Sequence, residues 1–291
     1  MAYSRSRTEK VDVRGVRYNV RHWGPADAPV VFFLHGWMDC SPTFQFLVDA
    51  LSQPWHVIAP DWRGYGESEW LSRPYWHADY YADLDCLLDH YSPGRPARIV
   101  GHSMGANISA VYAGVRPQRV AQLVMLDFLG LKPPVDDDSP ALISKWLHNV
   151  QEQPRLSVFN SSEALAARLM DLNPRLTESR AAFLSWNVSR VRMGNVVEMA
   201  CDPWHRVPSP NVYRIEDAMA SWSRIEAPVL LLVATHGFVN RRFGNEPEEF
   251  ARRTGAFKCL EIVNIPDSGH NVQHDQPERV AEAIEAFLAR D

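Results

Sequence analysis

The sequence contains only four cysteines, Cys40, Cys86, Cys201 and Cys259, and none of them belongs to a C-x-x-C pair. A disulfide framework or a zinc site needs cysteines paired at short, regular spacing. We therefore expect four free thiols in a reducing compartment, which indicates a cytoplasmic protein. The first residues are polar and lead into no apolar segment, so we predict no secretory signal.

Long apolar runs, an excess of basic residues and nucleotide-binding motifs are also missing. The longest apolar runs, Val30–Leu34 and Val229–Val233, are too short to span a membrane. The net charge of −5 gives no support to binding of nucleic acid or of an acidic membrane surface. Neither a G-x-G-x-x-G nor a Walker A pattern is present. The expected partner is therefore a small-molecule substrate, and a homodimer stays open.

Apolar, β-branched segments alternate with helical patterns along most of the 291 residues. The expected strands are Val16–Trp23, Val30–Leu34, His56–Ala59, Ala97–Gly101, Gln122–Asp127, Pro228–Ala234 and Lys258–Ile265. The expected helices between them are Pro42–Leu51, Ala78–Tyr91, Met104–Val115, Pro247–Arg253 and Gln276–Arg290. This alternation predicts an α/β fold with a mostly parallel, doubly wound sheet. Ligands of such sheets bind beyond the carboxyl ends of the strands.

The interval from about Gly130 to Pro210 breaks this alternation. No strand is evident there, and helical patterns occupy Pro140–Gln151, Ser162–Leu172 and Glu178–Val191. We predict a core domain formed by residues 1–130 and 211–291, with residues 131–210 as a helical cap over the strand ends. Its aromatic side chains should form an apolar substrate pocket, for which we select Trp146, Trp186 and Trp204.

The segment Gly101–Gly105 reads GHSMG and lies between a predicted strand and a predicted helix. A G-x-S-x-G motif in this context forms a sharp turn, which exposes the serine hydroxyl and admits only small residues two positions away. The helix N-terminus behind the turn offers free N–H groups to a developing oxyanion. Ser103 is therefore a candidate nucleophile; the alternative is a serine that merely caps the helix.

Four further motifs occur before and after the sharp turn at Gly101–Gly105, which we call the elbow. They are His35–Asp39 (HGWMD), Asp61–Ser68 (DWRGYGES), Leu126–Gly130 (LDFLG) and Ser268–His270 (SGH). With the elbow, they resemble the α/β-hydrolase superfamily over nearly the whole chain, and most closely its serine hydrolase-like capped esterases. The resemblance implies an α/β-hydrolase fold with a helical cap inserted after the sixth strand.

The resemblance also implies roles for individual residues. His270, between the last strand and the final helix, would be the general base, although a plain loop histidine is the alternative. The backbone N–H groups of Trp37 and Met104 would form the oxyanion hole. His274 follows His270 by four residues, but the helix and the glutamate of H-E-x-x-H are missing. We therefore predict neither a metal nor a cofactor.

The triad acid is where the chain departs from its relatives. They usually carry it just after the strand that corresponds to Pro228–Ala234, but here no carboxylate occurs before Glu246. Some members of the superfamily place the acid one strand earlier, where this chain has Asp127. We select Asp127, against the alternative that it only holds a loop, and keep Glu246 and Asp267 as further candidates.

The sequence thus predicts a serine hydrolase that cleaves a carboxylic ester, or a related acyl bond, of a small and largely apolar substrate through an acyl-enzyme. The same triad serves a carbon–carbon bond hydrolase, a lactonase or a thioesterase, and these stay open. A binding protein that retains the fold without catalysis is the alternative from another class.

Overall fold

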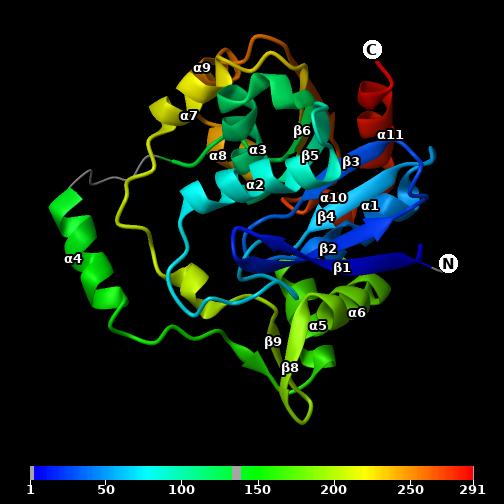
Figure 1. Ribbon diagram of the computed structural model, residues 1–291. Coiled ribbons are helices and arrows are strands. Elements are labelled where there is room, and N and C mark those ends of the chain that lie inside the picture. Colours follow the sequence, from blue (N-terminus) through cyan, green and yellow to red (C-terminus); the bar gives the residue numbers. More distant parts are fainter. Residues whose placement is uncertain (1–2, 133–138, 291) are drawn as a thin grey trace.

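The computed structural model describes residues 3–132 and 139–290 (Figure 1). Its main sheet has eight strands in the order β1-β2-β4-β3-β5-β6-β10-β11. Their bounds are β1 Ser6–Val13, β2 Val16–Trp23, β3 Val30–Leu34, β4 His56–Pro60, β5 Ala97–His102, β6 Val120–Leu126, β10 Val229–Ala234 and β11 Leu260–Ile265. β2 pairs antiparallel with β1 and β4, and the other neighbours are parallel. The predicted fold class is confirmed.

Helices cover both faces of this sheet (Figure 1). Their bounds are η1 Ser41–Phe44, α1 Gln45–Ala50, α2 His77–Tyr91, α3 Met104–Val115, η2 Pro117–Arg119, α7 Ile215–Trp222, α8 Phe238–Phe243, α9 Pro247–Thr254, α10 Val272–Asp275 and α11 Pro277–Leu288. In β3, Phe32 and Leu34 pack into the core on the α2 and α3 face, whereas Val31 and Phe33 pack toward α1 and α11. A strand that is buried on both faces needs an uninterrupted apolar sequence, as β3 has.

The insertion between β6 and α7 carries a small sheet as well as helices. Its described elements are α4 Ser139–Asn149, β7 Val158–Phe159, α5 Ser162–Leu172, α6 Glu178–Asn187, β8 Ser189–Met193, β9 Val196–Met199 and η3 Pro203–Arg206. The antiparallel sheet β7-β9-β8 corrects the expectation that this interval contains no strand. These strands are short, and β8 is mostly exposed, so no apolar run marks them. α4 stands apart from α5 and α6 (Figure 1).

Polar and aromatic contacts fix the end of the insertion to the loop after β4. The Tyr75 hydroxyl donates to the Asp202 carboxylate at 2.7 Å. The His205 ring stacks on both Tyr65 and Tyr75, with centroid distances of 3.9 and 3.8 Å. Burial lowers the pKa of His205 to about 3, so the ring stays neutral between the two tyrosines. The insertion is thereby held near the carboxyl ends of the strands.

Two features bear on the class of protein. Within residues 3–132 and 139–290, no helix is long and apolar enough to cross a membrane. The four cysteines are free thiols, and Cys40 and Cys201 are buried.

Candidate active site

Ser103 lies at the sharp turn between β5 and α3. Its backbone has φ 50° and ψ −112°, a conformation that residues other than glycine rarely adopt. Glycines on either side allow this turn: a Cβ on Gly101 would lie 2.6 Å from the backbone of Gly105, and one on Gly105 would overlap the Leu34 carbonyl. The turn therefore depends on both glycines of the motif, and it lifts the hydroxyl toward His270.

Ser103, His270 and Asp127 form one hydrogen-bonded chain. A carboxylate can only accept, so His270 Nδ1–H donates to Asp127 Oδ2, at 2.8 Å. Nε2 of this neutral imidazole is then the acceptor, and it receives the Ser103 hydroxyl at 3.0 Å. Asp127 is fully buried, whereas the His270 side chain is 29% exposed. This is the geometry that a nucleophile, a base and an orienting acid require.

The turn after β10 holds the Asp127 carboxylate with backbone groups. The N–H groups of Ala234 and Val239 donate to Oδ1 at 3.2 and 3.4 Å, and that of Phe238 donates to Oδ2 at 2.5 Å. A Cβ on Gly237 would overlap this carboxylate. The position where relatives usually carry an acid is thus a glycine turn that receives Asp127 from the neighbouring strand.

The contact at Gly237 gives a testable prediction. Gly237→Ala should displace the Asp127 carboxylate and with it His270, and a misplacement of about 1 Å can cost about 10²-fold in kcat. The measurement is kcat on an ester substrate, with thermal unfolding recorded in parallel. Gly94→Ala is the control for kcat: a Cβ there meets no atom within 4 Å, and the strain of alanine at φ 66° should lower thermal stability without moving His270. A folded Gly237→Ala variant with the wild-type kcat would contradict this account.

The other histidines near His270 are neutral and structural. His102 Nε2–H donates to the His270 carbonyl at 2.9 Å, and burial holds the pKa of His102 well below its usual range. Burial likewise lowers the pKa values of His35 and His274 to about 4. His35 Nε2 accepts from the Trp62 N–H at 2.9 Å, which braces the loop after β3. Near neutral pH, His35, His102 and His274 therefore carry no charge.

The two residues predicted for the oxyanion hole flank this turn. Met104 is the first residue of α3, and Trp37 follows Gly36, whose Cβ position lies 3.2 Å from the Ser103 Cβ. In the described part of the chain, neither the Trp37 nor the Met104 N–H donates to another backbone or side-chain group. The Trp37 side chain is 55% exposed, and the predicted oxyanion hole uses only the backbone N–H of this residue.

A cavity of about 190 Å³ lies beside Ser103 and is mostly apolar. Its walls come from the loop after β3, the elbow, the His270 loop and the insertion. The insertion supplies Leu169, Leu172, Asn173, Leu176, Leu184, Val188 and Met199. Asp39 also faces it, and burial raises the pKa of this carboxyl to about 6. Asp39 and these leucines are site residues that the sequence analysis did not single out.

None of the three predicted tryptophans lines this cavity. Trp186 is 74% exposed on α6, and its neighbour Leu184 faces the cavity instead. Trp146, on α4, packs near Trp76, with ring centroids 6.1 Å apart. Trp204 lies on η3. The prediction that these three tryptophans form the pocket is therefore corrected: the insertion contributes mainly aliphatic side chains of α5, α6 and the segments that follow them.

The remaining alternatives from the sequence concern Glu246 and Asp267 as acids and His274 as a metal ligand. Glu246 pairs with Arg242 at 2.7 Å, and Asp267 is exposed in the loop before His270; neither contacts the imidazole. His274 Nε2 hydrogen-bonds the Thr43 hydroxyl at 2.7 Å. Within the described residues, no three His, Cys, Asp or Glu side chains gather as metal ligands.

The protein-family model described as alpha/beta hydrolase fold matches residues 29–277 of the sequence. The chain belongs to this family. The match runs from β3 to the first residue of α11, so it includes the elbow, Asp127 and His270.

Individual relatives are hydrolases by name. A serine hydrolase-like protein of Danio rerio is 28% identical, and the alignment covers 91% of this chain and 83% of the relative. A bifunctional esterase/perhydrolase of Acinetobacter calcoaceticus is 35% identical over 117 residues, 38% of this chain and 41% of the relative. Among solved structures, a thioesterase domain from the curacin biosynthetic pathway superposes with a TM-score of 0.83 at 22% identity, covering 97% of this chain and 99% of the domain. That last likeness concerns the fold.

Proposed function

We propose that this protein hydrolyses carboxylic esters of small, largely apolar acyl groups through an acyl-enzyme on Ser103. The observation that carries the proposal is the hydrogen-bonded chain from Asp127 through His270 to Ser103. The esterase/perhydrolase relative supports ester chemistry, and the apolar cavity beside Ser103 supports an apolar acyl group. A screen over esters, lactones and thioesters of graded acyl length tests it.

The first half of the reaction uses the chain of hydrogen bonds in order. Ser103 Oγ attacks the ester carbonyl carbon while its proton moves to His270 Nε2. Asp127 stabilises the resulting imidazolium, and the N–H groups of Trp37 and Met104 bind the oxyanion. The carbon–oxygen bond to the alcohol then breaks, and His270 returns the proton to the leaving oxygen. The alcohol departs, and the acyl group remains on Ser103.

The second half repeats these steps with water. His270 Nε2 takes a proton from a water molecule whose oxygen attacks the acyl carbon. The bond to Ser103 Oγ breaks, and His270 gives the proton back to the serine. The carboxylic acid is released, and every group returns to its starting protonation state. No step needs a group beyond the side chains and backbone amides already named.

The apolar cavity predicts a dependence on acyl length. Each buried methylene contributes about 0.8 kcal/mol of transfer free energy, or roughly fourfold in kcat/KM. From the acetate ester upward, kcat/KM should rise until the cavity of about 190 Å³ is full and not beyond, so the optimum is the acyl length that fills the cavity. The measurement is kcat/KM across a series of straight-chain 4-nitrophenyl esters.

Leu184→Ala should move the optimum to longer acyl chains, because Leu184 faces the cavity and its truncation enlarges it. Trp186→Ala, on the same helix but 74% exposed, is the matched control and should leave the optimum in place. Unfolding curves of both variants separate lost stability from altered specificity. A kcat/KM that is flat from acetate to octanoate in all three proteins would remove the acyl cavity from the proposal.

A further inference from the structure

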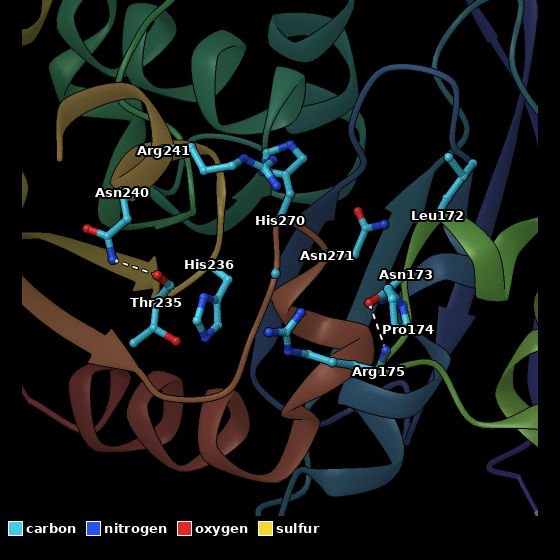
Figure 2. Close-up of a pocket in the computed structure, with 11 residues that line it drawn as sticks. Leu172, Asn173, Pro174, Arg175, Thr235, His236, Asn240, Arg241, His270 and Asn271 are labelled. Carbon is cyan, nitrogen blue, oxygen red and sulfur yellow. Dashed lines mark hydrogen bonds between the residues drawn. The ribbon is translucent and has the colours of Figure 1, made fainter. Parts of the chain in front are cut away.

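A second and larger cavity, of about 520 Å³, adjoins His270 (Figure 2). Its lining includes Arg175, which follows α5, and Arg241 of α8, together with His236 and Asn271. Figure 2 shows Arg241 extending toward His270, and Arg175 extending from the other side of the view toward His236. Among the residues that the structure describes, no aspartate or glutamate lines this cavity.

The two guanidinium groups have no carboxylate partner within the described residues. Neither Arg175 nor Arg241 forms an ion pair there. On the loop side lies Asp275, whose two oxygens accept from the Gly269 N–H at 2.7 Å and from the Asn173 amide at 2.6 Å. Asp275 therefore holds the wall of the cavity, and the two positive charges remain available to a ligand.

We infer that this cavity binds an anionic group on the alcohol portion of the ester, so that the substrate combines an apolar acyl group with a carboxylate or phosphate-bearing alcohol. The inference rests on the proposed function. Guanidinium groups bind carboxylates and phosphates through charge-assisted hydrogen bonds. Arg175 and Arg241 are then specificity residues rather than catalytic ones.

Two observations place the anion on the alcohol side of the scissile bond. His270 must reach the leaving oxygen to protonate it, and His270 and Asn271 line both cavities. An alcohol group that leaves beside His270 can therefore extend from the Ser103 cavity into the arginine-lined one. The cavity that contains Ser103 is lined largely by apolar side chains of the insertion, and it also includes the carboxyl of Asp39. A negative charge on the acyl group would therefore meet apolar walls and a like charge, which disfavours binding.

The test compares esters that differ in one charge. The alcohol-side pair is 3-(butyryloxy)benzoate and the neutral 3-(butyryloxy)benzamide; the acyl-side pair is monophenyl glutarate and phenyl valerate. For the alcohol-side pair, the Arg175→Gln/Arg241→Gln double variant should lower the ratio of anionic to neutral kcat/KM about tenfold. Added salt should also lower the wild-type ratio, because the arginines are exposed.

Arg95→Gln is the matched control. Arg95 is exposed in the loop before β5, at the amino end of that strand and far from the elbow, so the ratio should not change. A ratio that is unchanged in the double variant overturns the inference, as does a preference for the anion confined to the acyl-side pair. Ser103→Ala separates this failure from that of the proposed function: if the wild type hydrolyses none of the four esters faster than Ser103→Ala, the proposed function itself has failed.

Discussion

Ser103→Ala should lower kcat on esters by about 10⁴–10⁶-fold, as the loss of a triad nucleophile does in other serine hydrolases. The hydroxyl is the group that His270 Nε2 binds at 3.0 Å, and alanine offers nothing to attack the carbonyl. The fold should persist, because alanine is smaller and meets the same backbone strain at φ 50°. The measurement is kcat, with thermal unfolding as the check on folding.

A covalent label tests whether the lower kcat of Ser103→Ala reflects the loss of the nucleophile. After treatment with a fluorophosphonate, mass spectrometry should place the adduct on the peptide that contains Ser103, and the Ser103→Ala protein should stay unlabelled. Cysteine labelling is not expected at Cys40 or Cys201, since burial raises the pKa values of both thiols. An adduct on another residue, with Ser103 unmodified, would refute the acyl-enzyme mechanism.

The core strands and helices could be predicted because their sequences carry the pattern of burial. The ranges expected for β2, β3 and α3 agree with the structure residue for residue. β1 was missed because Ser6–Val13 is an edge strand whose side chains are mostly exposed and polar. The β8-β9 hairpin was missed for a similar reason, although the Gly194-Asn195 turn between two short runs is a hairpin signal.

The candidate site also has a part that could be predicted and a part that could not. The motifs and their order predict which loops carry Ser103, His270 and Asp127, because a parallel sheet gathers its carboxyl ends at one edge. They do not predict which face of a helix in the insertion is directed toward Ser103. On α6, Leu184 faces the cavity and Trp186 faces solvent, since residues two apart on a helix point in nearly opposite directions.

The prediction of Asp127 combined the missing carboxylate after Ala234 with the alternative acid position that the resemblance implies, and its physical basis is visible only in three dimensions. Gly237 occupies the turn where relatives usually carry a carboxylate, and the Asp127 side chain fills the space beside it. The N–H groups of Phe238 and Val239 then receive a carboxylate from β6. In the sequence, the only sign of this arrangement is that no carboxylate directly follows β10 and that a glycine, Gly237, occupies the turn.

Asp127→Asn should reduce kcat by about 10⁴-fold, because the amide cannot satisfy all four donors that surround the carboxylate. Oδ1 accepts from Ala234 and Val239, whereas Oδ2 accepts from Phe238 and from His270 Nδ1. If the amide NH₂ takes the place of Oδ2, it requires His270 to accept at Nδ1. The proton then sits on Nε2, and the imidazole cannot take the Ser103 proton.

If the NH₂ takes the place of Oδ1 instead, it faces the Ala234 and Val239 N–H groups, and these buried donors lose their acceptor at a cost of about 1–3 kcal/mol. Either orientation is costly, so the variant should lose both kcat and thermal stability. Asp267→Asn and Glu246→Gln are the matched controls, since neither carboxylate contacts His270. Kinetics on one ester, with fluorophosphonate labelling rates, measure the difference. If Asp127→Asn keeps the wild-type kcat while either control loses it, the acid of this site is not Asp127.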